Sequence, residues 1–229
     1  MKRALWLIAL ALLCTAGYAA DSKRSWDLTG NRDALRTIVT QCLDPTVPNY
    51  CAQCPTPIDG KCGVDSCWNT IDVWAETPEF VAIRDRKMCR CPRGFVHGLA
   101  LPRTIATGVE DPHRPDAIWA FAWQIALMRI SAPEEIVLVV NPPYARTQDE
   151  LHVHIVRLLD NGRARIDARK PVRIASLDKV WETAAAHAKR EGYPNYGVAV
   201  VRAEDDGYLV VSTYASPEWM FTESTCGQW

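Results

Sequence analysis

The sequence predicts an α+β fold in which helices pack on an antiparallel sheet. Short apolar runs separated by turn residues indicate strands, and two longer periodic segments indicate helices. With 48% hydrophobic and 23% charged residues, the composition is that of a folded chain of one or two domains. It excludes a disordered, collagen-like or polytopic membrane protein. The formal net charge of -1 gives no global electrostatic case for nucleic acid, so no nucleic-acid partner is expected.

Residues 1–20 are expected to direct export rather than to join the fold. Lys2 and Arg3 precede an apolar run, and small residues follow it at Gly17 and Ala19. This order is typical of a cleavable signal peptide. The apolar run is shorter than the roughly 20 residues that span a bilayer. An uncleaved N-terminal membrane anchor is the alternative.

Residues 21–75 are expected to form an N-terminal helix and a cysteine-rich loop segment. The helix is predicted over Asn31 to Leu43, with Asn31 as its N-cap. From 43 to 75, prolines, glycines and cysteines occur with little periodicity, which predicts a loop-rich segment stapled by disulfides. Zinc binding is the alternative there, because Cys51 and Cys54 have ligand-like spacing.

The cysteine content supports export to an oxidising compartment. Outside the export segment there are eight cysteines: Cys42, Cys51, Cys54, Cys62, Cys67, Cys89, Cys91 and Cys226. An even number permits up to four disulfides, but the 105 possible connectivities leave the pairing open. Cys226 is expected to pair back to the N-terminal part of the chain.

Residues 76–229 are predicted to form the main α+β domain. The expected strands are 79–85, 95–101, 136–140, 151–159, 197–202 and 208–214. The expected helices are 115–130, which is apolar nearly all round and therefore buried, and 176–190. The last two strands should form a hairpin around Asp205-Asp206-Gly207. His113 and His187 are expected on the surface.

One strand carries most of the chemistry. Side chains of a strand alternate between its faces, so Glu150, His152 and His154 share one face. Three hydrogen-bonding residues come just before it: Arg146, Thr147 and Gln148. A solvated polar face and a His-x-His metal site are possible interpretations, but the metal site lacks an evident further ligand. Imidazoles beside a cation and neutral donors favour chemistry at a phosphate.

These residues resemble a known family. The segment Glu150-Leu151-His152-Val153-His154-Ile155-Val156 is similar to the histidine-triad motif His-φ-His-φ-His-φ-φ, where φ is apolar. The segment from His97 to Arg103 is similar to the preceding strand of that superfamily. The N-terminal signal, the helix around Trp119 and the Arg-Thr-Gln turn resemble bacterial CDP-diacylglycerol pyrophosphatase. The resemblance implies a histidine-triad-like catalytic domain.

The resemblance also implies residue roles. His152 would be the catalytic nucleophile, and His154 would act with it. The substrate-binding residues would be His97, Asn141, Arg146, Thr147, Gln148 and Glu150. Glu150 replaces the first histidine of the triad, a position that acts chiefly through its backbone carbonyl. No metal and no cofactor is expected.

The implied reaction is hydrolysis of CDP-diacylglycerol to CMP and phosphatidate through a cytidylyl-histidine, in phospholipid metabolism. The implied location is the periplasmic face of the bacterial inner membrane, with peripheral or anchored membrane contact and no obligatory protein partner. Two alternatives stay open. Glu150 favours a non-catalytic nucleotide- or lipid-binding relative, and His152, His154 and the cysteines allow a secreted metal-binding protein.

Overall fold

The computed structural model describes residues 31–43 and 71–227. Within these ranges, eight strands form one sheet in which every neighbouring pair is antiparallel. In sheet order the strands are β1 (Val73–Glu76), β2 (Phe80–Arg84), β3 (His97–Pro102), β5 (Val153–Arg157), β4 (Ile136–Val140), β7 (Gly197–Arg202), β8 (Tyr208–Thr213) and β6 (Val172–Ile174). The mixture of helices with an antiparallel sheet confirms the predicted α+β class.

Short helices connect and cover the strands. They are α1 (Ala34–Thr37), which continues as a π-helical turn Ile38–Cys42, α2 (Ile118–Arg129), α3 (Gly162–Asp167), α4 (Val180–Glu191) and α5 (Pro217–Phe221). Single 3-10 turns occur at Arg86–Met88, Pro133–Glu135, Pro143–Ala145 and Leu177–Lys179.

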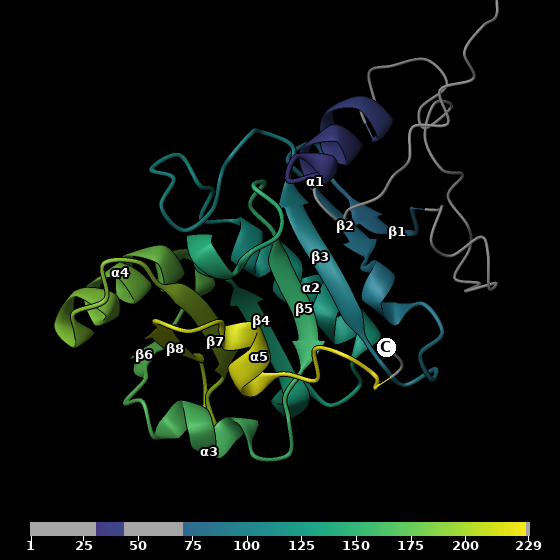
Figure 1. Ribbon diagram of the computed structural model, residues 1–229. Coiled ribbons are helices and arrows are strands. Elements are labelled where there is room, and N and C mark those ends of the chain that lie inside the picture. Colours follow the sequence, from purple (N-terminus) through teal and green to yellow (C-terminus); the bar gives the residue numbers. More distant parts are fainter. Residues whose placement is uncertain (1–30, 44–70, 228–229) are drawn as a thin grey trace, which may run out of the picture.

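The two faces of the sheet are covered differently. On one face, Trp119 of α2 and Trp181 of α4 pack with strand residues such as Ile155 in the largest apolar cluster. On the other face, α1 covers β2 and β3, while α3 and α5 cover β4, β7 and β8 through separate apolar clusters. Figure 1 shows α1 at one end of β3 and α5 in front of the sheet, with α2 behind it. The polar residues of β3 and β5 lie on the face that α1 and α5 share.

Most of the predicted long elements are present, and the short ones were missed. The strand predicted over 151–159 is regular only from Val153 to Arg157, followed by an isolated bridge between Leu158 and Thr222. The helix predicted over 176–190 begins with a 3-10 turn and ends at Gly192, whose φ of 75° suits glycine. The missed elements are β1, β6, α3 and α5. Each is too short for its hydrophobic period to show clearly.

Two burial predictions need correction. Helix α2 is buried over most of its length, but Met128 is 70% exposed because it lies with Gln124 and Leu127 on the stripe of the helix that faces solvent. His187 was expected on the surface, yet this residue of α4 is buried, and its Nε2 lies 3.2 Å from the carbonyl oxygen of Arg169. The amphipathic pattern of α4 places His187 on the side that faces β8.

A disulfide joins Cys226 to Cys91, so the C-terminal cysteine does pair with an earlier segment of the chain. Cys42 and Cys89 are also disulfide-bonded. The cysteines of the 44–70 stretch, and the export segment at 1–20, lie outside the described residues. Among the described helices, none is both long and apolar enough to cross a bilayer.

Candidate active site

Three histidines meet on the face of β3 and β5 that carries no large helix. In the register of the two strands Leu99 lies opposite His154 and His97 opposite Val156, which places both histidines on the same face. His97 Nε2 lies 2.9 Å from His154 Nδ1. The rings of His152 and His154 are 4.8 Å apart between centroids. All three imidazoles are buried, so the shared face that the alternation of β5 predicts is an enclosed histidine cluster.

The hydrogen bond of His152 fixes its chemistry. Its Nδ1 lies 2.7 Å from the backbone oxygen of Glu150, and a carbonyl oxygen can only accept. The proton therefore resides on Nδ1, and Nε2 keeps its lone pair. Burial lowers the pKa of His152, and the bond to Glu150 offsets this only in part. His152 is thus a neutral imidazole with one available nitrogen at neutral pH.

Burial also lowers the pKa of His97 and holds that of His154 well below its ordinary value. Neither ring is isolated. The Nε2 atom of His154 is 3.5 Å from Asn141 Nδ2 and 3.6 Å from Glu218 Oε2. Both ring nitrogens of His154 therefore have partners inside the protein, since its Nδ1 lies 2.9 Å from His97 Nε2.

Glu218 is a site residue that the sequence reasoning missed. Its Oε2 accepts a hydrogen bond of 2.6 Å from Asn141, and its Oε1 pairs with the Lys87 ammonium. Burial by itself raises the pKa of Glu218, but the proximity of His154 and Lys87 outweighs burial and holds the pKa well below its usual range. A charged carboxylate therefore lies beside the histidine cluster.

Helix α5 positions this carboxylate. Ser216 caps the helix by accepting a hydrogen bond of 3.3 Å from Trp219 N, and Pro217 occupies the first turn. The Ser216 hydroxyl also donates to Asn141 Oδ1 at 2.7 Å. Ser-Pro-Glu is a recognisable helix start in the sequence, so the helix was detectable. Its docking against Asn141 was not, because nothing local to either segment indicates it.

The short turn after β2 supplies two more charged groups. Asp85 Oδ1 caps the turn by accepting from Lys87 N at 2.9 Å, and Asp85 Oδ2 lies 3.5 Å from His97 Nε2. Burial lowers the pKa of Lys87, but Asp85 and Glu218 outweigh burial and raise it, so the amine stays charged. In the described part of the chain, Asp85, His97 and His154 form one group whose potential ligand atoms lie within 4.8 Å of one another.

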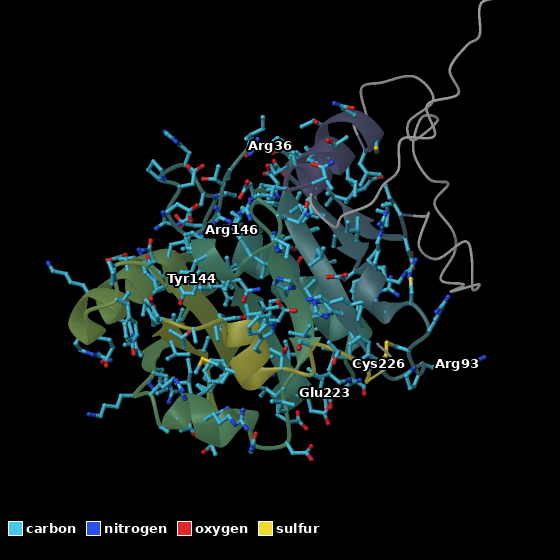
Figure 2. The ribbon with its side chains drawn as sticks, viewed as in Figure 1. Arg36, Arg93, Tyr144, Arg146, Glu223 and Cys226 are labelled. Atoms are coloured by element: carbon cyan, nitrogen blue, oxygen red, sulfur yellow. A yellow bond between two sulfur atoms is a disulfide. The ribbon has the colours of Figure 1, made fainter. Side chains whose placement is uncertain are left out.

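The three predicted donors before β5 have separate environments. Arg146 forms two hydrogen bonds to Glu110, at 2.5 and 2.9 Å. Gln148 is buried; it donates to Asn31 O at 2.9 Å and accepts from Leu35 N at 3.1 Å, which ties α1 to the loop before β5. Thr147 is exposed. In Figure 2, Arg146 lies between Arg36 and Tyr144. Their roles toward a substrate stay predictions.

Glu150, the residue that departs from the triad pattern, is held inside the protein. Its carboxylate accepts from Ala106 N at 3.1 Å and from Arg36 Nε at 3.2 Å. Burial raises the pKa of Glu150, while the Ala106 amide and Arg36 oppose the shift. The cation that compensates the carboxylate is thus Arg36 of α1. The backbone oxygen of Glu150 is left to orient His152.

An antiparallel α+β fold with a buried histidine cluster beside the ion pair of Glu218 and Lys87 is that of a candidate phosphorus-directed hydrolase. Comparison with known families agrees. The CDP-diacylglycerol pyrophosphatase family matches residues 30–211, and the chain belongs to this family. The match ends before α5, so Glu218 lies outside the matched residues.

Individual relatives are similar over a shorter stretch. The CDP-diacylglycerol pyrophosphatase of Mycobacterium bovis (strain BCG / Pasteur 1173P2) is 39% identical over an alignment of 67 residues, which covers 25% of this chain and 26% of that protein. The protein of the same name from Mycobacterium tuberculosis (strain ATCC 25177 / H37Ra) gives the same values. The aligned part of the chain therefore spans about a quarter of the length of these curated relatives.

Proposed function

We propose that the protein hydrolyses the diphosphate bond of CDP-diacylglycerol to CMP and phosphatidate, with His152 as a covalent nucleophile. The observation that carries this proposal is the hydrogen bond between His152 Nδ1 and Glu150 O, because it leaves the Nε2 lone pair available in a neutral ring. Membership of the CDP-diacylglycerol pyrophosphatase family supports the choice of substrate. The same geometry supports, as a further proposal, a relationship to the histidine-triad superfamily.

The reaction would proceed in two displacements. His152 Nε2 attacks the phosphorus that bears cytidine, the N–P bond forms, and the bond from that phosphorus to the phosphatidate oxygen breaks. Water then attacks the same phosphorus and releases one proton to solvent, the N–P bond breaks with its electron pair returning to Nε2, and CMP leaves while His152 returns to its neutral form. The Nδ1 proton remains on the hydrogen bond to Glu150 O throughout. His154 and His97 would hold nonbridging oxygens, and Asn141 would keep His154 oriented.

Export to the periplasmic face of the inner membrane is also a proposal. The residue pattern of 1–20 supports it, as does the disulfide between Cys91 and Cys226, because structural disulfides persist in oxidising compartments. The lipid part of the substrate would require contact with a membrane surface.

The decisive experiment measures CMP release from CDP-diacylglycerol. His152→Ala should abolish turnover because the attacking atom is gone, whereas His154→Ala and His97→Ala should retain more. His113→Ala is the matched control, since this histidine side chain is 89% exposed. In the wild type, the acidic limb of the pH profile should lie below pH 6.5, because burial lowers the pKa of His152 and protonation of Nε2 removes the nucleophile. Substantial turnover by His152→Ala would exclude the covalent mechanism.

A metal-binding function is the second candidate, and the grouping of Asp85, His97 and His154 is the observation that favours it. Metal analysis of the purified mature protein distinguishes the two. A stoichiometric metal ion without CMP release would favour this second function. Binding of CDP-diacylglycerol without turnover and without metal would instead identify a non-catalytic relative.

A further inference from the structure

Binding of a diphosphate requires a cation near the histidine cluster. The arginine that precedes the motif in the sequence, Arg146, already pairs with a carboxylate. Arg146 is bound to Glu110 through both terminal nitrogens, and its side chain is only 8% exposed. Arg36 is bound to Glu150 and Asp33. Lys87 also pairs with a carboxylate, but it differs in position, because the oxygens of its partner Glu218 lie 3.6 Å from His97 Nε2 and His154 Nε2 and the lysine side chain is 31% exposed.

Glu218, the partner of Lys87, also contacts residues other than the lysine. Glu218 also accepts from Asn141 at 2.6 Å, and its two oxygens lie 3.6 Å from His97 Nε2 and His154 Nε2. The carboxylate would therefore keep polar neighbours if Lys87 turned away. A buried carboxylate left without such neighbours would be strongly destabilising.

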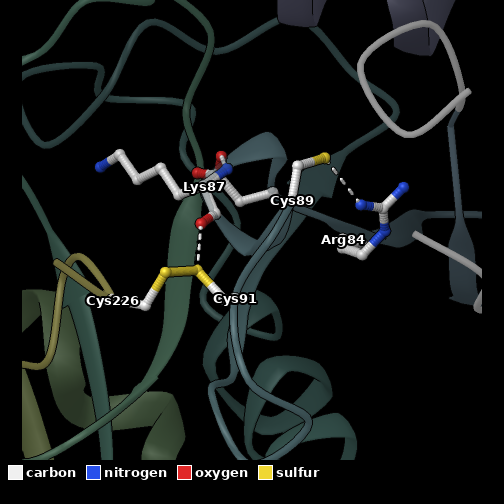
Figure 3. The surroundings of a disulfide bond; sticks show 6 residues. Arg84, Lys87, Cys89, Cys91 and Cys226 are labelled. Carbon is white, nitrogen blue, oxygen red and sulfur yellow. Dashed lines mark hydrogen bonds between the residues drawn. A yellow bond between two sulfur atoms is a disulfide. The ribbon is translucent and has the colours of Figure 1, made fainter. Parts of the chain in front are cut away.

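The segments that carry the two charges are joined covalently. Cys91 follows the turn that contains Lys87, and Cys226 follows α5, which contains Glu218. Cys91 Sγ lies 3.0 Å from the backbone oxygen of Lys87. In Figure 3 the Lys87 side chain extends away from the disulfide, so the bond constrains the backbone of the turn and not the ammonium group directly.

We propose that Lys87 is the phosphate-binding cation of this site and exchanges Glu218 for the nonbridging oxygens of a diphosphate. This inference rests on the proposed function, which makes the substrate a diphosphate. The lysine has a flexible stem and three donors, so it can change partner without losing its charge. Glu218 is then a positioning residue, which stays on Asn141 and holds His154 and His97 in place.

The first arm of the test compares Lys87→Met with Lys87→Arg and uses CMP and cytidine as competing ligands. Lys87→Met should raise KM and weaken CMP binding by roughly 10- to 100-fold, the loss typical of a charged hydrogen bond. Cytidine binding should not change, because cytidine has no phosphate. Lys87→Arg should recover part of the CMP affinity. Lys189→Met, at an exposed lysine of α4, is the matched control.

The second arm uses Glu218→Gln, which removes the anion that competes for Lys87. CMP should bind this variant at least as tightly as wild type, while kcat falls because His154 loses its carboxylate neighbour. The single variant Lys87→Met leaves the buried Glu218 carboxylate without its cation. If that variant fails to fold, the double variant Lys87→Met with Glu218→Gln replaces it, because the double variant buries no unpaired charge. The double variant should show the weakened CMP binding.

Two results would overturn the inference. In the first, Lys87→Met weakens the binding of CMP and of cytidine equally. In the second, KM and kcat change in parallel in both single variants, because a purely structural ion pair predicts both results. CMP binding that depends on Lys87 supports the inference whether or not the wild type releases CMP from CDP-diacylglycerol. Absence of that release contradicts only the proposed function.

Discussion

His154 lies on β5 and His152 directly precedes that strand, yet their ring nitrogens have different partners. His152 donates to a backbone oxygen, and His154 lies among His97, Asn141 and Glu218. A single strand period therefore separates the proposed nucleophile from the proposed oxyanion-binding group. At the scale of residues, the hydrogen-bond partner assigns the role, because it decides which nitrogen carries the proton.

At Glu150 the partners of the side chain and of the backbone oxygen also differ: the carboxylate accepts from Ala106 and Arg36, and the backbone oxygen accepts from His152. We expect Glu150→Gln to keep kcat within about threefold of wild type, because an amide oxygen still accepts from Ala106 N and the backbone bond to His152 is unchanged. Glu150→Ala should lower the free energy of unfolding by about 1–3 kcal/mol, since the Ala106 amide and Arg36 lose their acceptor. Urea unfolding and CMP release measure the two effects. A fall in kcat of ~10²-fold in Glu150→Gln, with unfolding unchanged, would show instead that the carboxylate takes part in catalysis.

At the scale of elements, α5 has an influence out of proportion to its length. This helix runs only from Pro217 to Phe221, too short to be stable alone, and depends on its cap and on burial of Phe221 against α3 and the sheet. Its N-terminal end brings Ser216 and Glu218 to Asn141. The helix therefore connects the end of β4 to the histidine cluster.

Ser216→Ala tests that connection. The variant loses the cap of α5 and the hydrogen bond to Asn141, which should reduce the free energy of unfolding by about 1–3 kcal/mol. The kcat should fall by roughly 10-fold, less than the ~10²-fold that follows a 1 Å displacement of a catalytic group. Ser176→Ala is the control, because Ser176 also precedes a helical turn but makes no capping hydrogen bond there. Equal effects at both serines would contradict a specific role for α5.

At the scale of the whole molecule, the disulfide between Cys91 and Cys226 spans a sequence separation of 135 residues. It ties the C-terminal segment, which follows α5, to the turn after β2. In the sheet order β3 and β5 lie between β2 and β4, one of the strands that α5 covers. Figure 1 shows the C-terminal segment crossing the sheet from α5 toward the turn that follows β2. The disulfide therefore holds the C-terminal segment, which follows Glu218, against the turn that carries Lys87.

Removing this bond should destabilise the protein. Cys91→Ser with Cys226→Ser should reduce the free energy of unfolding by about 2–4 kcal/mol, the usual range for a disulfide that constrains a long loop in the unfolded chain. Denaturant unfolding with and without a reductant measures it. Titration of the unreduced, denatured mature protein should find few free thiols among its eight cysteines. An unchanged unfolding midpoint under reducing conditions, or mostly free thiols, would contradict this.

The sequence by itself determined the class of fold and one face of the site. Alternation along β5 placed His152 and His154 together, and the apolar periods located the longer strands and helices, because both depend on residues close in the chain. The family was also recognisable from these local motifs.

Only the tertiary structure decided which charges meet. Lys87 and Glu218 pair across 131 residues of sequence, and Gln148 binds Leu35 across 113. Arg146, which precedes the motif in the sequence, is bound to Glu110. Local periodicity fixes the face to which a side chain points, whereas its partner depends on how distant elements pack. A buried charge is stable only when packing brings an opposite charge or hydrogen-bond partners to it.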